Sequence, residues 1–474
     1  MKDRDGSALG TAGRPDSMAN DLTIYEQKGR QPSQVSTAEL ITICIILALA
    51  SGGLSKLFVS TTGAAMDRVD GDVSFGVTAL YIPAYLYTLW IMYRMPFAFF
   101  KAIKRIGPLW IPILFSAVSL LWSLSPATTG RRFALLLMCA FFSAALVTRL
   151  GRSGLVRVIG FTAIGIVVVQ LLSAIVVPSL GMPHDKFYPA IPGLFLQKNG
   201  AGRTLVIGLI AGLALLQTRP KALSYTVLGA SMLGVAASTS GTAIGSAALC
   251  LIIYYILVSL RGAGLFWLST IAGLIVALLF VGSFGLTFLS DDSTYAVLGK
   301  DATLTGRTSI WAGVWRAINA GHHWWTGYGY EAFFASPQGV GSINWNMYDY
   351  VPPHAHNGLL QTWLNTGIIG VILTIGSLLY LFVRAADNFA KLNDRLSTFD
   401  IVFMAFFLLV NVTEQTTMLY NNFIWVMFVA VAALPGIDGR AAQRIGAPGR
   451  GARASVTNAR DGASDDIFQH TRER

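Results

Sequence analysis

Residues 222–260, ALSYTVLGASMLGVAASTSGTAIGSAALCLIIYYILVSL, form a run of 39 residues without a charge. An α-helix needs about 20 apolar residues to cross the hydrocarbon core of a membrane, so this run has room for two crossings. The polar group STSG at residues 238–241 supplies a turn between them. The sequence therefore predicts two antiparallel membrane helices, near 222–238 and 241–260.

Further uncharged runs extend the same pattern along the chain. They cover residues 106–130, 158–184, 262–290, 350–383 and 415–437. The whole chain is 54% hydrophobic and 12% charged, whereas a soluble domain carries about a quarter charged residues. The runs exceed the roughly 10-residue strands of a membrane barrel and do not alternate as such strands do. We expect an all-α, polytopic membrane bundle and exclude an ordinary soluble enzyme.

About twelve transmembrane helices fit these runs. They are expected near 39–59, 74–93, 106–123, 132–149, 155–180, 201–217, 222–238, 241–260, 263–288, 357–383, 400–413 and 420–436. Lysine and arginine concentrate on short loops when the N-terminus is placed inside, which sets the orientation. The expected organisation is a cytoplasmic disordered tail (1–38), a transmembrane domain (39–436) with a large periplasmic loop (289–355), and a second cytoplasmic disordered tail (437–474).

The net charge of +11 lies largely in inner loops and tails. Basic residues in these places lie beside anionic lipid, so the charge requires no nucleic-acid partner.

The long outer loop is rich in aromatic residues, among them Trp311, Trp324, Trp325, Tyr328 and Tyr330. Such rings suit an interfacial belt at the membrane surface. They equally suit a surface that stacks on sugar rings, because they combine apolar area with polar tips. Both interpretations are open at this point, and the second makes Trp311 a substrate contact.

Arg307 follows Thr305 and Gly306 and opens a predicted short helix that ends near residue 320. In the first turn of a helix, a guanidinium group and the free backbone N–H groups together make a site suited to phosphate. The alternative is a solvated arginine on a loop helix.

The segment PPHAHNG at residues 352–358 joins the loop to the next span, which we expect to begin at about His356. An imidazole at a helix N-terminus tends to stay neutral, as a general base must. His356 has two other interpretations, an interfacial residue or a metal pair with His354, for which the sequence offers no adjacent third ligand. Asn357 and Gln361 share one helix face and could point their amides into the mouth of the bundle.

Other polar residues fall near the outer ends of the predicted spans. They are Arg131, Arg132, Lys198, Asn199, Arg203 and Glu414. Ionisable groups near membrane depth are costly and therefore candidates for function, although any one of them could also be a snorkelling interface residue. Their concentration on one side predicts a site there.

Several of these motifs together resemble a known family. HNG at 356–358, LQ at 360–361, NTG at 365–367 and Gly370 resemble the signature of the O-antigen ligase and Wzy-type polysaccharide polymerase superfamily. TGR at 305–307 with Trp311, and GYGY at 327–330 with Phe333, resemble the large loop of that family. Lys198-Asn199 with Gly202, Trp122-Ser123 with Arg131, and Glu414 resemble the exopolysaccharide-polymerase branch. The resemblance covers roughly residues 122–428.

The resemblance implies a glycan transferase of the bacterial inner membrane that needs no metal and no cofactor. Its donor would be an oligosaccharide on undecaprenyl pyrophosphate, transferred to an acceptor hydroxyl at the periplasmic face. By the family's pattern, His356 would deprotonate the acceptor and Arg307 would hold the pyrophosphate leaving group, with Arg203 or Lys198 sharing its charge. Membrane lipid, a chain-length regulator and export proteins are the further partners it implies.

The signature departs from the family's pattern at one position. Many relatives carry an acidic residue directly after the leucine where Gln361 stands here, which weakens the ligase assignment or moves the acidic role to Glu414.

Three functions are compatible with the sequence. The first is a polymerase that joins lipid-linked repeat units into exopolysaccharide. The second is an O-antigen ligase that attaches a finished glycan to lipid A-core. The third is a transporter or flippase for the lipid-linked sugar, which would need functional ionisable residues on both sides of the bilayer midplane. The candidates here lie toward the outer ends of the spans, which favours an enzyme.

Overall fold

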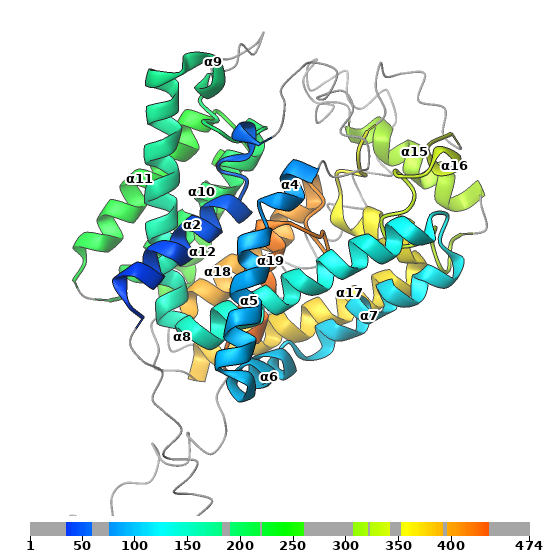
Figure 1. The fold of residues 1–474 in the computed structure, drawn as a ribbon, viewed down its shortest axis with the longest axis horizontal. Coiled ribbons are helices and arrows are strands. Elements are labelled where there is room, and N and C mark those ends of the chain that lie inside the picture. The colour runs from blue at the N-terminus through cyan, green and yellow to red at the C-terminus, as the bar shows by residue number, and fades with distance from the viewer. Residues whose placement is uncertain are drawn as a thin grey trace, which may run out of the picture.

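The computed structural model describes residues 35–58, 75–182, 190–218, 220–259, 307–320, 323–341, 352–391 and 396–435. Every regular element within these residues is a helix (Figure 1). The predicted span at 263–288, residues 1–34 of the first tail, all of the second tail and much of the loop at 289–355 lie outside the described residues.

The helices follow one another in three groups along the chain. The first group is α2 (Thr37–Ala50), α4 (Phe75–Ala79), α5 (Ile82–Arg94), α6 (Pro96–Arg105) and α7 (Trp110–Val118), with the 3-10 turns η1 (Ser55–Leu57), η2 (Gly107–Leu109) and η3 (Ser119–Trp122). The second is α8 (Pro126–Val176), α9 (Pro178–Gly181), α10 (Lys198–Leu215), α11 (Ala222–Ser238) and α12 (Gly241–Ser259). The third is α15 (Arg307–Ala320), α16 (Pro337–Gly341), α17 (Gly358–Lys391), α18 (Ser397–Thr413) and α19 (Phe423–Ala433).

Three of the described helices, α8, α12 and α17, are long and apolar enough to cross a membrane. A fourth crossing is possible if α6 and residues 107–122, which are bent by 82° at their junction, count as one span. Helices α2, α11, α18 and α19 are apolar but shorter. The structure thus supports a helical membrane protein, while the number of twelve spans stays a prediction.

Left-handed backbone positions mark two of the predicted turns. Gly151, with φ of 59°, breaks α8 between the spans expected at 132–149 and 155–180. Thr239, with φ of 48°, ends α11 just before α12 begins at Gly241. The turn predicted at residues 238–241 is therefore confirmed.

Helices α18 and α19 form the centre of the bundle. In Figure 1 they lie between the group α10–α12 and the group α7 and α17, and α18 contacts α10, α12 and α17. Every residue of α19 is buried, and Trp425 stacks on Phe428 with ring centroids 5.5 Å apart. A helix that is apolar all round belongs in a core. The connection between α18 and α19, which carries Glu414, is consequently enclosed by other helices.

The aromatic residues of the outer loop form a core of their own. Ile310, Trp311 and Val314 on one face of α15 are buried in one cluster with Tyr328 and Phe333. Trp311 is 0% exposed, whereas Trp325 is 64% exposed. For Trp311 the structure supports neither open interpretation, because its ring packs inside the protein.

Helix α17 is interrupted at Gly367, whose φ is 69°. The loop segment at residues 324–329 fills this break with backbone hydrogen bonds. The N–H groups of Tyr328 and Gly329 donate to the carbonyl groups of Leu364 (2.9 Å) and Asn365 (3.0 Å). A Cβ atom at Gly367 would collide with the backbone of Trp325, so this position requires glycine. The uncharged run at 350–383 predicts one continuous helix near 357–383, and no residue pattern in it indicates the break.

Candidate active site

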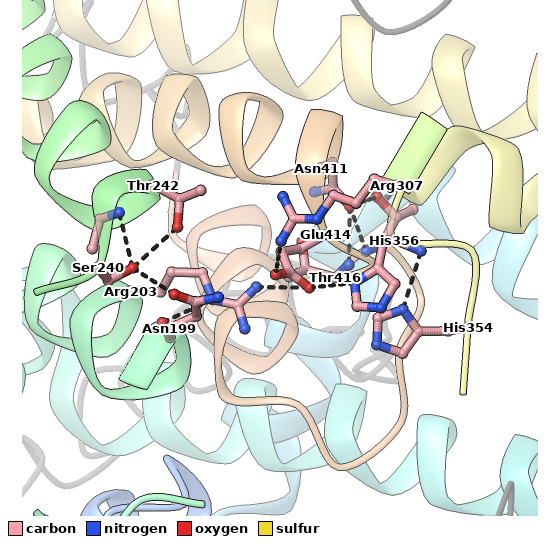
Figure 2. A network of polar contacts seen from close by, with 12 residues as sticks. Asn199, Arg203, Ser240, Thr242, Arg307, His354, His356, Asn411, Glu414 and Thr416 are labelled. Carbon is pink, nitrogen blue, oxygen red and sulfur yellow. Dashed lines mark hydrogen bonds and ion pairs between the residues drawn. The ribbon is translucent and has the colours of Figure 1, made fainter. Parts of the chain in front are cut away.

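Three side chains from separate parts of the chain meet at the carboxylate of Glu414 (Figure 2). The Arg307 guanidinium donates through Nη2 to Oε1 of Glu414 at 2.8 Å. Arg203 approaches the other oxygen, Oε2, with Nη1 at 3.3 Å. Nδ1 of His356 also lies 3.3 Å from Oε2. The structure therefore brings together four of the residues that the sequence had singled out.

The end of α18 and the turn that follows determine where the Glu414 side chain points. Its N–H group donates to the carbonyl of Val410 at 2.9 Å, and its backbone is then extended. Oδ1 of Asn411 accepts from the N–H groups of Thr416 (3.1 Å) and Thr417 (2.9 Å). The Asn411 side chain thereby holds the turn that follows Glu414, and this turn keeps the Glu414 carboxylate at the end of the bundle.

The HNG motif has a local structural explanation. Helix α17 begins at Gly358, two residues later than the expected start at His356. Asn357 is its cap, because Oδ1 accepts from the N–H groups of Leu359 and Leu360, each at 3.0 Å. A side chain at Gly358 would collide with that of Asn411 on α18, so glycine allows the two helix ends to meet. Asn357 is buried and serves the backbone rather than the mouth of the bundle.

His356 occupies a left-handed backbone conformation with φ of 49°. Its N–H group donates to Nδ1 of His354 at 3.2 Å, and the two rings lie 4.0 Å apart between centroids. Removal from water lowers the pKa of His354 to about 3, and repulsion by His356, Arg203 and Arg307 acts in the same direction. His354 is therefore a neutral ring that supports His356.

Glu414 is ionised in this environment. Burial alone would raise the pKa of its carboxyl group, but Arg203 and the hydrogen bond from His356 outweigh burial and hold that pKa well below its ordinary value. The two guanidinium groups and the one carboxylate together leave a surplus positive charge. The cluster is therefore suited to an additional anion.

The third interpretation of His356, a metal pair with His354, needed a ligand that the sequence did not reveal. The structure corrects this point, since ligand atoms of His354, His356 and Glu414 all lie within 4.8 Å of one another. However, both oxygens of Glu414 already pair with guanidinium groups. A divalent cation at this place would be repelled by Arg203 and Arg307, so the donor set fits an anion better than a metal.

Trp311 and Gln361 hold the chain just before His356. Nε1 of Trp311 donates to the carbonyl of Ala355 at 2.9 Å, and the N–H group of Ala355 donates to Oε1 of Gln361 at 2.8 Å. Both side chains are buried. In the structure both side chains support the backbone before His356, whereas the sequence had predicted direct substrate contacts. The helix expected from Arg307 to residue 320 is confirmed as α15.

Arg203 is fixed from the other side of the site. Its Nε donates to the carbonyl of Asn199 at 3.1 Å, and the Asn199 side chain accepts from Oγ of Ser240 at 2.8 Å. Ser240 also contacts Thr242 at 3.1 Å. Figure 2 shows this network running from the turn between α11 and α12 to Glu414. Asn199 therefore belongs to the site, as a residue that holds Arg203.

Two predicted residues are not among the described ion-pair partners of Glu414. Lys198 is the half-buried first residue of α10, and Arg131 is exposed on α8. The ion pairs of Glu414 that the structure describes come from Arg203, Arg307 and His356 instead.

Sequence reasoning missed two residues of this network, Ser240 and Asn411. It also missed that His354 supports His356. Ser240 lies within the STSG turn and Asn411 three residues before Glu414, but neither spacing announces the contact.

The protein is thus a helical membrane protein with a buried, positively charged site that contains the His356 imidazole. Residues 225–375 match the family O-antigen ligase (Wzy_C). This match confirms the resemblance to the O-antigen ligase and Wzy-type superfamily, whose members are glycan-transferring enzymes. It covers about a third of the chain and includes Arg307 and His356 but not Arg203 or Glu414. No curated protein matches the chain.

Proposed function

We propose that this protein is a polysaccharide polymerase that joins oligosaccharide repeat units carried on undecaprenyl pyrophosphate. The observation that carries this proposal is the meeting of Arg203, Arg307 and His356 at one carboxylate. A diphosphate-linked sugar needs cations for its leaving group and a base for the acceptor hydroxyl, and both are present within one cluster.

The geometry supports a specific course of reaction. Ionised Glu414 can only accept hydrogen bonds, so Nδ1 of His356 is the donor between them and Nε2 is left as the basic atom. The acceptor oxygen forms a bond to the anomeric carbon of the donor sugar and its proton passes to Nε2. The bond from that carbon to the phosphate oxygen breaks, and the electron pair leaves with the pyrophosphate. Arg203 and Arg307 stabilise the charge that grows there.

Glu414 acts through His356 in this scheme. A carboxylate on Nδ1 holds the ring in the tautomer that exposes a basic Nε2, and it stabilises the imidazolium formed during transfer. This assigns to Glu414 the acidic role that many relatives give to a residue at the position of Gln361.

A transporter is the alternative function from a different class. The charged residues at the opposite end of α18 argue against this alternative. Asp400 in the first turn forms a buried ion pair with Arg152 at 2.8 Å. Fourteen residues of helix separate Asp400 from Glu414, or about 21 Å. Arg149 pairs with Glu39 on α2 at 2.5 Å. These pairs connect helices, and the nearby Arg384 donates to the backbone carbonyl groups of Arg105 and Ala432. At the Glu414 end two guanidinium groups and an imidazole converge on one carboxylate, as an enzyme with one site requires.

The family match suits a ligase as well as a polymerase. The proposal of a polymerase rests on the resemblance to the exopolysaccharide-polymerase branch and on an acidic role for Glu414. In a deletion strain, shortened glycan chains would support the polymerase, and full-length chains that remain unattached to lipid A-core would support the ligase. We also propose that the Glu414 end faces the periplasm of a bacterial inner membrane, where a chain-length regulator and export proteins would receive the product.

The central test is the substitution His356→Ala. We expect polymer to disappear and lipid-linked repeat units to accumulate, because the acceptor hydroxyl loses its base. Gel analysis of polysaccharide and mass spectrometry of the lipid fraction measure both effects. His470→Ala, in the C-terminal tail, is the matched control and should behave as wild type. Normal polymer from His356→Ala at normal protein levels would remove His356 from the mechanism.

A further inference from the structure

A second buried carboxylate, Glu331, lies beside the candidate site and has no part in the proposed reaction. Glu331 is 8% exposed, and its backbone has a φ of 55°. Non-glycine residues rarely adopt this conformation, and buried carboxylates are rare without dedicated hydrogen-bond donors. Both features indicate that Glu331 is held in place by its surroundings.

One arm of hydrogen bonds connects Glu331 to Glu414. Oε1 of Glu331 accepts from Nε2 of Gln415 at 2.5 Å, and Gln415 directly follows Glu414 in the chain. Gln415 is 3% exposed. A change in the position of the Glu331 carboxylate would therefore be transmitted to the backbone of Glu414.

A second arm leads from the same oxygen to His356. Nδ2 of Asn365 donates to Oε1 of Glu331 at 2.8 Å, and Oδ1 of Asn365 accepts from Gln361 at 3.0 Å. Gln361 in turn accepts from the N–H group of Ala355 at 2.8 Å, and Ala355 precedes His356. All three side chains in this arm are buried.

The main chain of Glu331 is anchored to other helices. Nη1 of Arg132 on α8, a residue that is 3% exposed, donates to the Glu331 carbonyl at 2.5 Å. The preceding residue, Tyr330, donates from its N–H group to Oγ of Ser119 at 2.9 Å and from its hydroxyl to the carbonyl of Met418 at 2.6 Å. Glu331 is thus a fixed point from which the two arms extend.

We infer that Glu331 is a positioning residue, whose acceptor oxygen Oε1 sets the separation of His356 and Glu414 by holding the segments that carry them. The inference deepens the proposed function, and it rests on that function only where activity is the readout.

The role of Glu331 requires an acceptor oxygen rather than a charge. Burial raises the pKa of its carboxyl group, although Arg132 and the amides of Asn365 and Gln415 oppose that rise. Gln has an oxygen at the same reach, whereas Leu has similar bulk and no acceptor.

The test compares Glu331→Gln with Glu331→Leu in the purified full-length protein. The first readout is the Nδ1 proton of His356 in NMR spectra of protein labelled at histidine, assigned by its loss in His356→Ala. The second is kcat and KM for transfer from a lipid-linked donor. We expect Glu331→Gln to retain the His356 signal and to lose less than about threefold in kcat, since it preserves the acceptor.

In Glu331→Leu we expect the His356 signal to shift or disappear and kcat to fall by about 100-fold, the effect of a displacement near 1 Å. KM for the donor should stay within about twofold, because Arg203 and Arg307 are not part of either arm. Gln415→Leu cuts one arm only and serves if Glu331→Leu does not fold. Gln170→Leu, which removes a buried amide that bonds to Ile191 and Gly234 instead, is the matched control and should leave the His356 signal unchanged.

Two results would overturn the inference. One is an unchanged His356 signal and kcat in both Glu331→Leu and Gln415→Leu. The other is an inactive Glu331→Gln with an intact His356 signal, which would mean that Glu331 acts by its charge or its proton. If the signal responds as expected while His356→Ala retains full transfer activity, Glu331 positions the pair as inferred, but the proposed function is wrong.

Discussion

Arg307 contributes more than a positive charge, because its planar guanidinium group can bond a phosphate with two parallel N–H groups. Lysine preserves the charge without this fork. For Arg307→Lys we expect at least about a tenfold loss of transfer rate, measured with a labelled lipid-linked donor. Arg316→Lys, on the exposed face of the same helix, is the matched control. Full activity of Arg307→Lys would mean that Arg307 pairs with Glu414 but does not hold the leaving group.

The ion pairs of Glu414 predict how stability depends on pH. The pKa of Glu414 in the folded protein lies below its unfolded value of about 4.3, because Arg203 and His356 outweigh burial. The carboxylate therefore stabilises the fold fully above that pH, and this stabilisation is lost as the pH falls toward the folded pKa. Glu414→Gln should cost about 3 kcal/mol at pH 7, since it removes the carboxylate that pairs with Arg203 and Arg307.

Thermal unfolding in detergent, followed from pH 7 downward, measures this effect. The difference between wild type and Glu414→Gln should shrink below about pH 4, because the carboxyl group of the unfolded chain then binds a proton while that of the folded protein stays ionised. A difference that stays constant over this range would mean that the charge of Glu414 does not stabilise the fold.

Sequence reasoning identified residue types at the site better than their neighbours. Arg307, His356 and Glu414 stood out because ionisable groups are costly in an apolar chain. Their convergence could not be derived, because 58 residues separate His356 from Glu414 and a helix pattern reports only its own faces. For the same reason the helix pattern predicts that Gln361 points its amide into the mouth of the bundle, although in the structure this amide accepts from the backbone of Ala355.

At the scale of elements, the break in α17 depends on a single glycine. Gly367→Ala adds a Cβ atom that collides with the backbone of Trp325, at a residue whose φ is positive. We expect a loss of about 2 kcal/mol or more and a displaced loop, seen as a lower melting temperature and reduced transfer. In the same helix, Gly376→Ala has open space around the new atom and should be neutral or slightly stabilising. Equal stability of the two variants would contradict this account.

Uncharged runs and turn residues predicted many helices to within a few residues. The boundaries of α11 and α12 follow from the STSG turn, and α15 follows from apolar residues on one face. The break at Gly367 could not be predicted because the loop segment that fills it lies about 40 residues upstream. The N–H groups of this segment bond to the carbonyl groups of α17 that the break leaves free. Apolar runs record burial and not the partner that provides it.

At the scale of the whole molecule, the two ends of the bundle should face different compartments. Trp325 is 64% exposed at the end where the loop fills α17, and Lys221 is an exposed residue at the start of α11. In a protein without Cys44, Cys139 and Cys250, a membrane-impermeant thiol reagent should label Trp325→Cys in intact spheroplasts. Lys221→Cys should be labelled only after the membrane is opened. Labelling of both cysteine variants in intact spheroplasts would contradict the proposed orientation.

The residues around the Glu414 carboxylate come from α10, α15, the segment before α17 and the end of α18. The site is therefore assembled from segments that lie far apart in the sequence. A gene fragment cut at residues 225 and 375 would retain Arg307 and His356 but discard Arg203 and Glu414. Chimeras between relatives that exchange only this middle portion would join half a site from each parent. Such hybrids would have a complete cluster only if the two outer residues matched, so the flanking segments matter as much to the site as the matched segment.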